Sequence, residues 1–585
     1  MPSAAPAWPP RDAGHLLVSA AEMAALEQQL FASGLPVAAL MEKAALAMAQ
    51  RLRAQLTPAA VAPSPLPAPP LPPWPRPLLP CGPRLAAMAA LVLVGPGHNG
   101  GDGLVIAREL HLAGIPVRLW SPFDRHRPLT EAHLRHALWL GIPRLAEPPD
   151  PRDPGLWIDA LFGTGQNRRP GEPLEALLEA RQRLRPGRLV AVDGPTGICA
   201  DSGRLLGTGA ATAALTWCLG LRKRGLLQDA AIGRVGHLEL VPLDLPQRLL
   251  DGLPAATPLA LGAADLASAP GPLLDPAAAK YGRGRLLLVS GSRRYRGAAA
   301  LALAGASASG CGSLRAVLPD VMTDGLWLRH PDVLLEAGLP SDAAGALQLA
   351  PLARLRLERL DALLLGPGLG LPAAAAAAED CPPARSCAED REGEVWEQLR
   401  TFPGLLLLDA DGLNRLAQRQ AGAGAHWLRQ RCGPSWLTPH RGEFDRLFPQ
   451  WADQPPLAAA AAAAAASGAA VLLKGARSVV AAADGRLWQL EQAAAEAARA
   501  GLGDTLAGYA AGRGAMAMAA GAGALDASLL AAAALEHAQA GLRCLRRLGR
   551  GGVTPMAVAE ELGRCRTSDR AALESGRNAE EDQLG

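Results

Sequence analysis

Short apolar runs alternate with helical patterns along the first half of the chain. Each run holds four or five residues and is bounded by glycine, proline or polar residues, which is typical of buried strands. Residues 17–54 instead carry apolar side chains at helical spacing and predict a helix. Because the strands are apolar on both faces, we expect a parallel sheet covered by helices. The predicted strands are residues 91–94, 117–120, 156–159, 189–193, 215–218 and 237–241.

A second alternating series begins at residue 285 and predicts a second α/β unit. Twelve prolines between residues 58 and 83 exclude a helix or a central strand there. In the second series, residues 371–397 are expected to form an insert with little order. The second set of predicted strands is residues 285–290, 314–318, 362–365, 405–408, 435–438 and 471–473. The resulting domains are residues 1–250 with a proline-rich insert at 57–83, a linker at 251–277, a second domain at 278–565 and a polar tail at 566–585.

Composition narrows the class of protein. Gly and Pro supply 116 of 585 residues, but apolar residues still make up 49%, which is enough for large cores. A net charge of +3 without a basic block argues against a nucleic-acid binder. Nine cysteines without a CxxC pair indicate free thiols in a reducing compartment. With no signal peptide and no run of 18 clean apolar residues, we expect a cytoplasmic protein that does not enter membranes.

Polar residues gather where three strands of the first domain end. A glycine-rich loop, residues 95–103, follows the first strand and carries Asn99 and Asp102, while Asp159 and Asp193 end two later strands. Parallel strands bring such residues to one edge of a sheet, where open α/β folds bind ligands. Oxygen-only donors suit a hard cation. A tight strand-to-helix turn and helix N-caps are the structural alternatives.

These segments resemble the NAD(P)H-hydrate epimerase domain. The resemblance rests on residues 40–44 (LMEKA), 97–103 (GHNGGDG), 159–165 (DALFGTG), 193–197 (DGPTG) and 216–227. Lys43 and His98 stand where the family has Asn, and Thr196 stands where it has Ser. The resemblance implies a K⁺ ion held by Asn99, Asp159 and Thr196, and Asp193 as the catalytic acid–base. It also implies contacts to the hydrated dinucleotide from His98, Asn99, Gly100, Gly101, Asp102, Gly163, Thr164, Gly165, Gln166, Asn167, Arg168, Arg169 and Asp193.

The second domain carries a glycine–aspartate turn before a helical stretch. Residues 501–506 (GLGDTL) place free N–H groups and the Asp504 carboxylate together, an arrangement suited to a phosphoryl group and a substrate hydroxyl. An Asp-capped helix would be the reading if this turn stood alone. Other glycine- or charge-bearing loops adjoin predicted strands in the same domain, at residues 280–284, 290–298, 365–370, 409–414, 438–444 and 473–478.

Taken in order, these loops resemble the ADP-dependent NAD(P)H-hydrate dehydratase, a ribokinase-like family. The resemblance implies substrate contacts from Ala298, Gly368, His440 and Asp504, with Asp504 catalytic and ADP and Mg²⁺ taking part. The stretch at residues 494–500 departs from the family pattern. The nucleotide contacts implied are Lys474, Gly475, Ala476, Arg477, Ser478 and Gly503.

The chain as a whole therefore resembles the bifunctional NAD(P)H-hydrate repair enzymes. The fold expected is α/β, with an N-terminal Rossmann-like three-layer domain followed by a ribokinase-like α/β domain. The expected activity is epimerisation of R and S hydrates (NADHX and NADPHX) and ADP-dependent dehydration of the S form. A ribokinase-like small-molecule kinase fused to a non-catalytic Rossmann-like binding module is the alternative. We expect no nucleic-acid partner and a homo-oligomer.

Overall fold

A computed structural model describes residues 8–56, 88–272, 275–372, 384–493, 495–521 and 525–564. The chain forms two compact units, one made of residues 11–258 and one made of residues 1–10 with 259–585. The predicted proline-rich insert and the polar tail lie outside the described residues. Within the described part of the chain, no helix combines the length and apolar composition needed to cross a bilayer.

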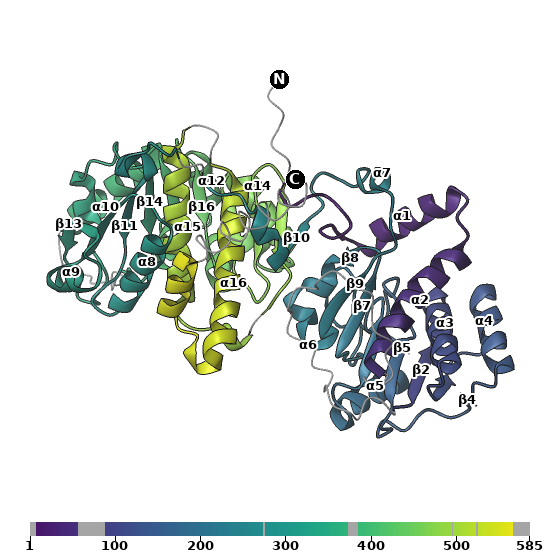
Figure 1. Cartoon of the computed structure of the whole chain (residues 1–585). Helices are drawn as coiled ribbons and strands as arrows, with labels where there is room; N and C mark the ends of the chain where they lie inside the picture. The colour runs from purple at the N-terminus through teal and green to yellow at the C-terminus, as the bar shows by residue number, and fades with distance from the viewer. Residues whose placement is uncertain are drawn as a thin grey trace, which may run out of the picture. The chain divides into compact units, whose positions relative to one another are not determined.

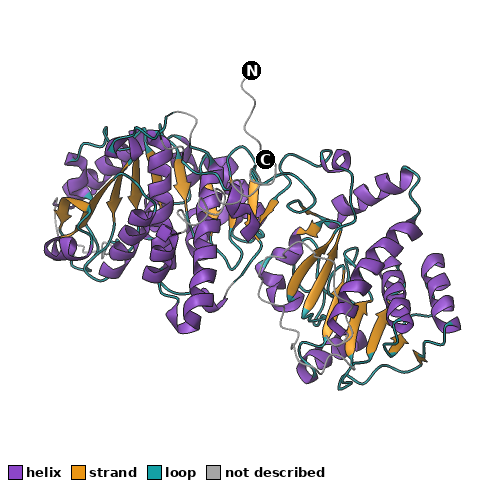
Figure 2. Cartoon of the chain, in the orientation of Figure 1, coloured by secondary structure: helices purple, strands orange, loops and turns teal. Residues whose placement is uncertain are grey.

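The first unit is a parallel seven-stranded sheet with the order β4-β3-β2-β5-β6-β7-β9 (Figure 1). All six predicted strands are confirmed, and helices lie on both faces of the sheet (Figure 2). The strand order reverses between β2 and β5, which leaves a crevice at the carboxyl edge of the sheet. The strands are β2 (Ala90–Val94), β3 (Val117–Trp120), β4 (Arg144–Leu145), β5 (Leu156–Ala160), β6 (Leu189–Val192), β7 (Leu215–Leu219) and β9 (His237–Val241). The helices between them include α3 (His98–Leu112), α4 (Pro128–Trp139), α5 (Glu172–Leu184) and α6 (Ile232–Val235).

The single helix predicted for residues 17–54 is wrong. A short strand, β1 (Leu17–Val18), pairs with β8 (Arg222–Lys223), and two helices follow, α1 (Ala20–Ala32) and α2 (Val37–Leu56). Gly34 adopts a φ of 101° and Pro36 removes a backbone donor, so the helical hydrogen-bond ladder stops between α1 and α2.

The second unit is a ten-stranded sheet with the order β10-β19-β18-β17-β16-β15-β14-β11-β12-β13. It is parallel except where β18 pairs with β17 and β19. The strand order reverses between β11 and β14, which creates a second crevice. The six strands predicted for this unit are confirmed: β11 (Arg285–Val289), β12 (Ser313–Pro319), β14 (Ala362–Leu365), β15 (Leu405–Leu408), β16 (Ser435–Leu437) and β17 (Ala470–Leu473). The strands not predicted are β10 (Leu259–Leu261), β13 (Val333–Leu339), β18 (Val479–Ala481) and β19 (Leu487–Leu490).

Two segments expected to be irregular contribute regular structure. β10 lies within the predicted linker and forms an edge strand of the second sheet. A helix, α10 (Ala384–Thr401), occupies much of the stretch predicted to have little order. The remaining helices of the second unit, apart from those below, are α9 (Leu326–Arg329), α11 (Asp411–Gln420), α12 (Gly424–Arg429), α13 (Arg441–Leu447) and α14 (Pro456–Ser467).

Glycines bring two helices of the second unit into backbone contact. Helix α8 (Arg296–Ala308) packs along α15 (Leu502–Ala519), and α16 (Ala527–Gly552) lies beside α15 (Figure 1). A Cβ atom added at Gly508 would lie 1.9 Å from the Ala302 carbonyl oxygen, and one added at Gly305 would lie 2.0 Å from the Thr505 carbonyl oxygen. Only glycine fits at these two positions, so the glycines fix the start of α15 against α8.

The first described residues of the chain pack on the second unit. The Trp8 indole donates to the Asp265 carbonyl at 3.2 Å, and the Trp488 indole donates to the Trp8 carbonyl at 3.1 Å. Residues 8–10 therefore belong structurally with a part of the chain that begins about 250 residues later.

Replacing Gly508 with Ala tests the helix contact. We expect Gly508→Ala to lower the free energy of unfolding of the second unit by about 1–3 kcal/mol, because the new methyl group meets backbone that cannot rotate away. Gly297→Ala is the matched control, since a Cβ there meets nothing within 4 Å and Ala favours a helix. Denaturant unfolding of both variants measures the difference, and equal stability would contradict the packing argument.

Candidate active sites

The first unit has a large cleft at the carboxyl edge of its sheet. The cleft has a volume of about 1160 Å³. Predicted site residues that line it are His98, Asn99, Asp102, Gly163, Thr164, Gly165, Gln166, Asn167, Arg168, Arg169 and Asp193. Gly100 and Gly101 are buried at the start of α3 and are not among the lining residues.

The glycine-rich loop is tight because of backbone contacts. A Cβ added at Gly95 would lie 1.7 Å from the Leu161 carbonyl oxygen, and one added at Gly100 would lie 2.0 Å from the Gly95 carbonyl oxygen. The glycines therefore let the loop after β2 fold against the loop after β5. This packing brings the free N–H groups at the start of α3 to the edge of the cleft.

Asp159 and Thr196 form a buried pair below the cleft. Asp159 accepts from the backbone N–H of Thr196 and from its hydroxyl, both at 2.8 Å. Burial raises the pKa of Asp159 to about 6, although these hydrogen bonds oppose the shift. In the orientation of Asn99 that satisfies its neighbours, Nδ2 donates to the Val192 carbonyl and Oδ1 accepts from the Gly163 N–H, each at 3.3 Å.

Asp193 is held in the cleft by a buried lysine. The ammonium of Lys223 donates to Asp193 Oδ1 at 2.7 Å and to the Leu219 carbonyl at 2.8 Å. The Thr164 hydroxyl donates to Asp193 Oδ2 at 2.7 Å. Burial disfavours the charged carboxylate, but Lys223 outweighs burial and lowers the pKa of Asp193. Asp193 also has a φ of 64°, a strained value for a residue other than glycine, which suggests that its position is functional.

The structure adds residues to the cleft that the sequence pattern did not indicate. Glu27 reaches it from α1, and Arg125, His126 and Arg127 come from the loop before α4. Glu27 follows Met23 by four residues and so lies on the apolar face of the predicted helix. A carboxylate in that position could have indicated Glu27 as a residue of the site. Lys43, one of the two departures from the family motifs, lies outside the lining and pairs with Asp244 at 2.5 Å.

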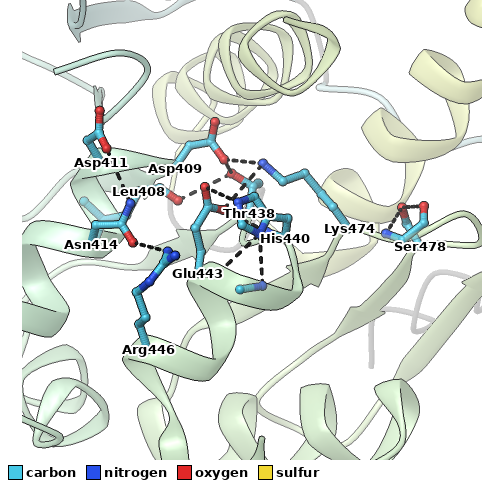
Figure 3. A network of polar contacts seen from close by, with 12 residues as sticks. Leu408, Asp409, Asp411, Asn414, Thr438, His440, Glu443, Arg446, Lys474 and Ser478 are labelled. Carbon is cyan, nitrogen blue, oxygen red and sulfur yellow. Dashed lines mark hydrogen bonds and ion pairs between the residues drawn. The ribbon is translucent and has the colours of Figure 1, made fainter. Parts of the chain in front are cut away.

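The second unit has a network of charged residues at the ends of three neighbouring strands (Figure 3). Lys474, after β17, points toward Asp409, after β15, and donates to it at 2.7 Å. The Thr438 hydroxyl donates to the same Asp409 oxygen at 2.8 Å. Burial alone would lower the pKa of Lys474, but Asp409 and Glu443 outweigh burial and raise it. The network therefore holds a positive charge at the edge of the sheet.

His440 begins helix α13 next to this network. Its Nδ1 accepts from the Gly442 N–H at 3.0 Å, and the backbone N–H of His440 donates to Glu443 Oε2 at 2.8 Å. This capping box fixes the backbone of the loop while about half of the His440 ring stays exposed. The exposed part of the ring is available to a ligand.

Asp504 lies in the first turn of α15, after Gly501. Gly501 adopts a φ of 91°, which permits the sharp entry into the helix. Burial and the nearby Asp409 carboxylate raise the pKa of Asp504 to about 7, although Lys474 opposes the shift. A carboxyl group with this pKa gains and loses a proton near neutral pH, as acid–base catalysis requires.

A mainly apolar cavity of about 500 Å³ lies between the start of α15, α16 and the loop after β17. Of the predicted nucleotide contacts, Lys474, Gly475, Ala476, Ser478 and Gly503 line it, and Arg477 does not. The altered stretch before Gly501 lines the cavity through Ala495, Ala497, Ala498 and Arg499. The sequence pattern did not indicate His537, which also lines it and whose Nε2 is buried without a hydrogen-bond partner among the described residues.

Ala298 and Gly368 lie against each other. A Cβ added at Gly368 would be 2.7 Å from the Ala298 Cβ, and the Gly368 φ of 67° favours glycine. Ala298 is on α8, the helix in backbone contact with α15. The glycine contacts between α8 and α15 therefore connect the surroundings of Ala298 to those of Asp504.

Comparisons with known proteins match both halves of the chain. The family described as NAD(P)H-hydrate dehydratase matches residues 286–564, and the family described as YjeF-related protein N-terminus matches residues 37–225. A bifunctional NAD(P)H-hydrate repair enzyme Nnr from Synechocystis is 39% identical over 93% of this chain and 94% of its own length. One from Gloeobacter violaceus is 40% identical over 84% of this chain and 87% of its own length. The solved ADP/ATP-dependent NAD(P)H-hydrate dehydratase from Bacillus subtilis is 22% identical, with a TM-score of 0.40 over 52% of this chain and 96% of that one.

Removing the lysine partner of Asp193 tests the first site. We expect Lys223→Met to lower the free energy of unfolding by about 3–5 kcal/mol, because it leaves the Asp193 carboxylate buried without a counter-charge. The double variant Lys223→Met with Asp193→Asn should recover part of this loss, since no buried charge remains. Denaturant unfolding measures both, and a single variant as stable as the original chain would show that the ion pair is dispensable.

Proposed function

Because the chain belongs to the bifunctional NAD(P)H-hydrate repair enzymes, we propose that its two units carry out successive steps in recovering NADH and NADPH from their hydrates. The first unit epimerises the R and S hydrates, and the second dehydrates the S form with consumption of ADP. Both activities on one chain serve a single purpose, since damage produces both epimers and only one is dehydrated. The first activity would lie in residues 11–258 and the second in residues 259–585, to which residues 1–10 also belong.

The first cleft supports the epimerase assignment. The loops at residues 97–102 and 163–169 would hold the hydrated dinucleotide, with the helix start of α3 facing its phosphates. Asp193 would act as a catalytic base, because Lys223 keeps it ionised at neutral pH.

The donors beneath the cleft fit a K⁺ ion. Asn99, Asp159 and Thr196 supply only oxygen ligands, which suit a hard cation. Turning the Asn99 amide over would bring its oxygen against the Val192 carbonyl. A cation between these two oxygens would offset their repulsion. A bound K⁺ ion would supply a fixed positive charge beside Asp193.

The second site supports the dehydratase assignment, and the position of Asp504 is the observation that carries it. A ring hydroxyl leaves poorly as hydroxide, but its phosphate ester leaves readily as the ring nitrogen's electron pair drives elimination. Asp504 would accept the hydroxyl proton, and the N–H groups at the start of α15 would face the developing phosphoryl charge. The apolar cavity beside Gly503 would take the adenine of the nucleotide.

Mg²⁺ would enter this site mainly on the nucleotide. No group of three or more His, Cys, Asp or Glu side chains in the described ranges is arranged to hold a metal. Mg²⁺ commonly uses one or two carboxylates together with substrate phosphates, which a site with few protein ligands can satisfy. When bound, the ion would offset phosphate charge.

We further infer a cytoplasmic homo-oligomer.

The decisive experiment follows NADH absorbance in a mixture of both NADHX epimers with ADP and Mg²⁺. We expect complete recovery of NADH, because the first unit keeps supplying the S epimer to the second. Recovery that stops near the initial S fraction, after subtraction of spontaneous epimerisation, would contradict the epimerase assignment. No recovery with ADP or ATP would contradict the dehydratase assignment.

In the same assay, Asp504→Ala should abolish NADH formation and leave interconversion of the epimers intact. Loss of both activities would contradict the assignment of one activity to each unit.

Potassium dependence tests the cation site. We expect the epimerisation rate to be higher in KCl than in tetramethylammonium chloride of equal ionic strength, because only K⁺ can occupy the oxygen donors. Asp159→Asn removes the one charged ligand among the three proposed donors and should abolish the difference between the two salts. An epimerisation rate indifferent to K⁺ in the unaltered chain would contradict the site.

A further inference from the structure

Glu27 is a carboxylate in the epimerase cleft to which the family motifs give no role. It reaches the cleft from α1, far in sequence from the loops that line the rest of it. Within the described part of the chain, Glu27 has no hydrogen-bond or ion-pair partner. The other carboxylate of the cleft with a proposed catalytic role, Asp193, is paired with Lys223. Of these two acids in one cleft, Asp193 is therefore paired with a cation and Glu27 is not.

Several contacts fix α1 so that Glu27 points inward. The pairing of β1 with β8 places the start of α1 beside Lys223. Ser19 and Glu22 form a capping box, and Glu22 pairs with Arg224. Met23 is buried, and its terminal methyl group would lie 2.7 Å from a Cβ added at Gly220. Glu27 follows Met23 by four residues and therefore lies on the same face of the helix, one turn further along.

Burial favours the protonated form of Glu27. Burial raises the pKa of Glu27, and Asp193 adds to the rise while Lys223 opposes it. Asp102, from α3, is also buried, and its pKa is raised well above its usual range by burial, Asp193 and Glu27. A protonated acid and an ionised base in one site are the two states that acid–base catalysis needs.

We propose that Glu27 is a second catalytic residue of the epimerase reaction and donates the proton that the departing hydroxyl of the substrate requires. The inference rests on the proposed epimerase function and assigns Glu27 and Asp193 to opposite proton transfers. They enter the cleft from α1 and from the loop after β6, two different elements, so each can serve a different position of the hydroxyl on the ring carbon.

The proton and electron balance of the reaction is complete with these two groups. The carbon–oxygen bond breaks with its electron pair going to oxygen, Glu27 supplies a proton, and water leaves. The ring nitrogen's lone pair forms a carbon–nitrogen double bond. Water then adds to the other face of that carbon, the nitrogen regains its lone pair, and Asp193 takes the proton released. The site then holds ionised Glu27 and protonated Asp193, which is the state suited to the reverse direction.

The test uses the full chain with one purified NADHX epimer and no ADP, and measures appearance of the other epimer by chromatography. We expect Glu27→Gln to lower kcat by about 100-fold or more with little change in KM, because the amide cannot donate a proton as an acid does. Glu27→Asp keeps the acid and should restore part of the rate. In the unaltered chain, after subtraction of the uncatalysed rate, kcat should fall as the pH rises through the raised pKa of Glu27. Glu27→Gln should lack this fall.

Controls separate this inference from the proposed function. Glu147→Gln neutralises an exposed carboxylate of the same unit and should keep the original rate. ADP-dependent dehydration of the S epimer by Glu27→Gln should be unchanged, and its denaturant unfolding curve should match that of the original chain, which verifies that both units are folded. If the unaltered chain does not interconvert the epimers, the proposed function fails. The role of Glu27 is overturned if the unaltered chain interconverts the epimers and Glu27→Gln has the same kcat and the same pH profile. It is also overturned if Glu27→Gln raises KM and leaves kcat unchanged.

Discussion

A largely buried pair of a lysine and an aspartate lies at the centre of each site, and much of the surrounding geometry depends on it. Lys223 and Lys474 are two of only four lysines in the chain, and each lies 2.7 Å from its partner, Asp193 or Asp409. A buried charge is costly unless it is compensated, so each pair requires the backbone around it to stay in place. In the first unit the lysine keeps Asp193 ionised. In the second it offers a positive charge beside Asp504, whose own proton is held loosely near pH 7.

Both pairs occur at strand ends because parallel strands terminate at one edge of a sheet. Where the strand order reverses, the carboxyl edge of the sheet offers a crevice in which polar side chains can face a ligand and keep their hydrogen bonds. Glycines then decide how close the loops and helices come. Gly95 and Gly100 allow one loop to fold against another, and Gly305 and Gly508 allow α8 and α15 to touch through their backbones. Glycines that take no part in the reaction therefore determine where the reactive side chains lie.

The sequence allowed prediction of the features that are local. Apolar runs located twelve strands, and loops such as residues 95–103 and 473–478 identified the carboxyl edges, because a strand followed by glycine and a polar residue is a pattern within one segment. Features that depend on distant contacts were not predictable in this way. β10 is a strand only because β19 pairs with it, and Glu27 reaches the cleft only because β1 pairs with β8. The helix break at residues 34–36 has a local signal in Gly34 and Pro36. The apolar spacing continues across these residues, so that spacing alone predicted one helix.

The packing of Trp8 on the second unit makes the connectivity of the chain unusual. The first unit, residues 11–258, is joined covalently to the second at both of its ends, so in topological terms it is an insertion near the start of the second. A cut at residue 258 would therefore not yield two intact proteins, because the downstream fragment would lack the segment that covers Trp488. If the gene split into two separate enzymes, another segment would have to replace residues 8–10 against Trp488. This requirement opposes separation of the two units onto different chains.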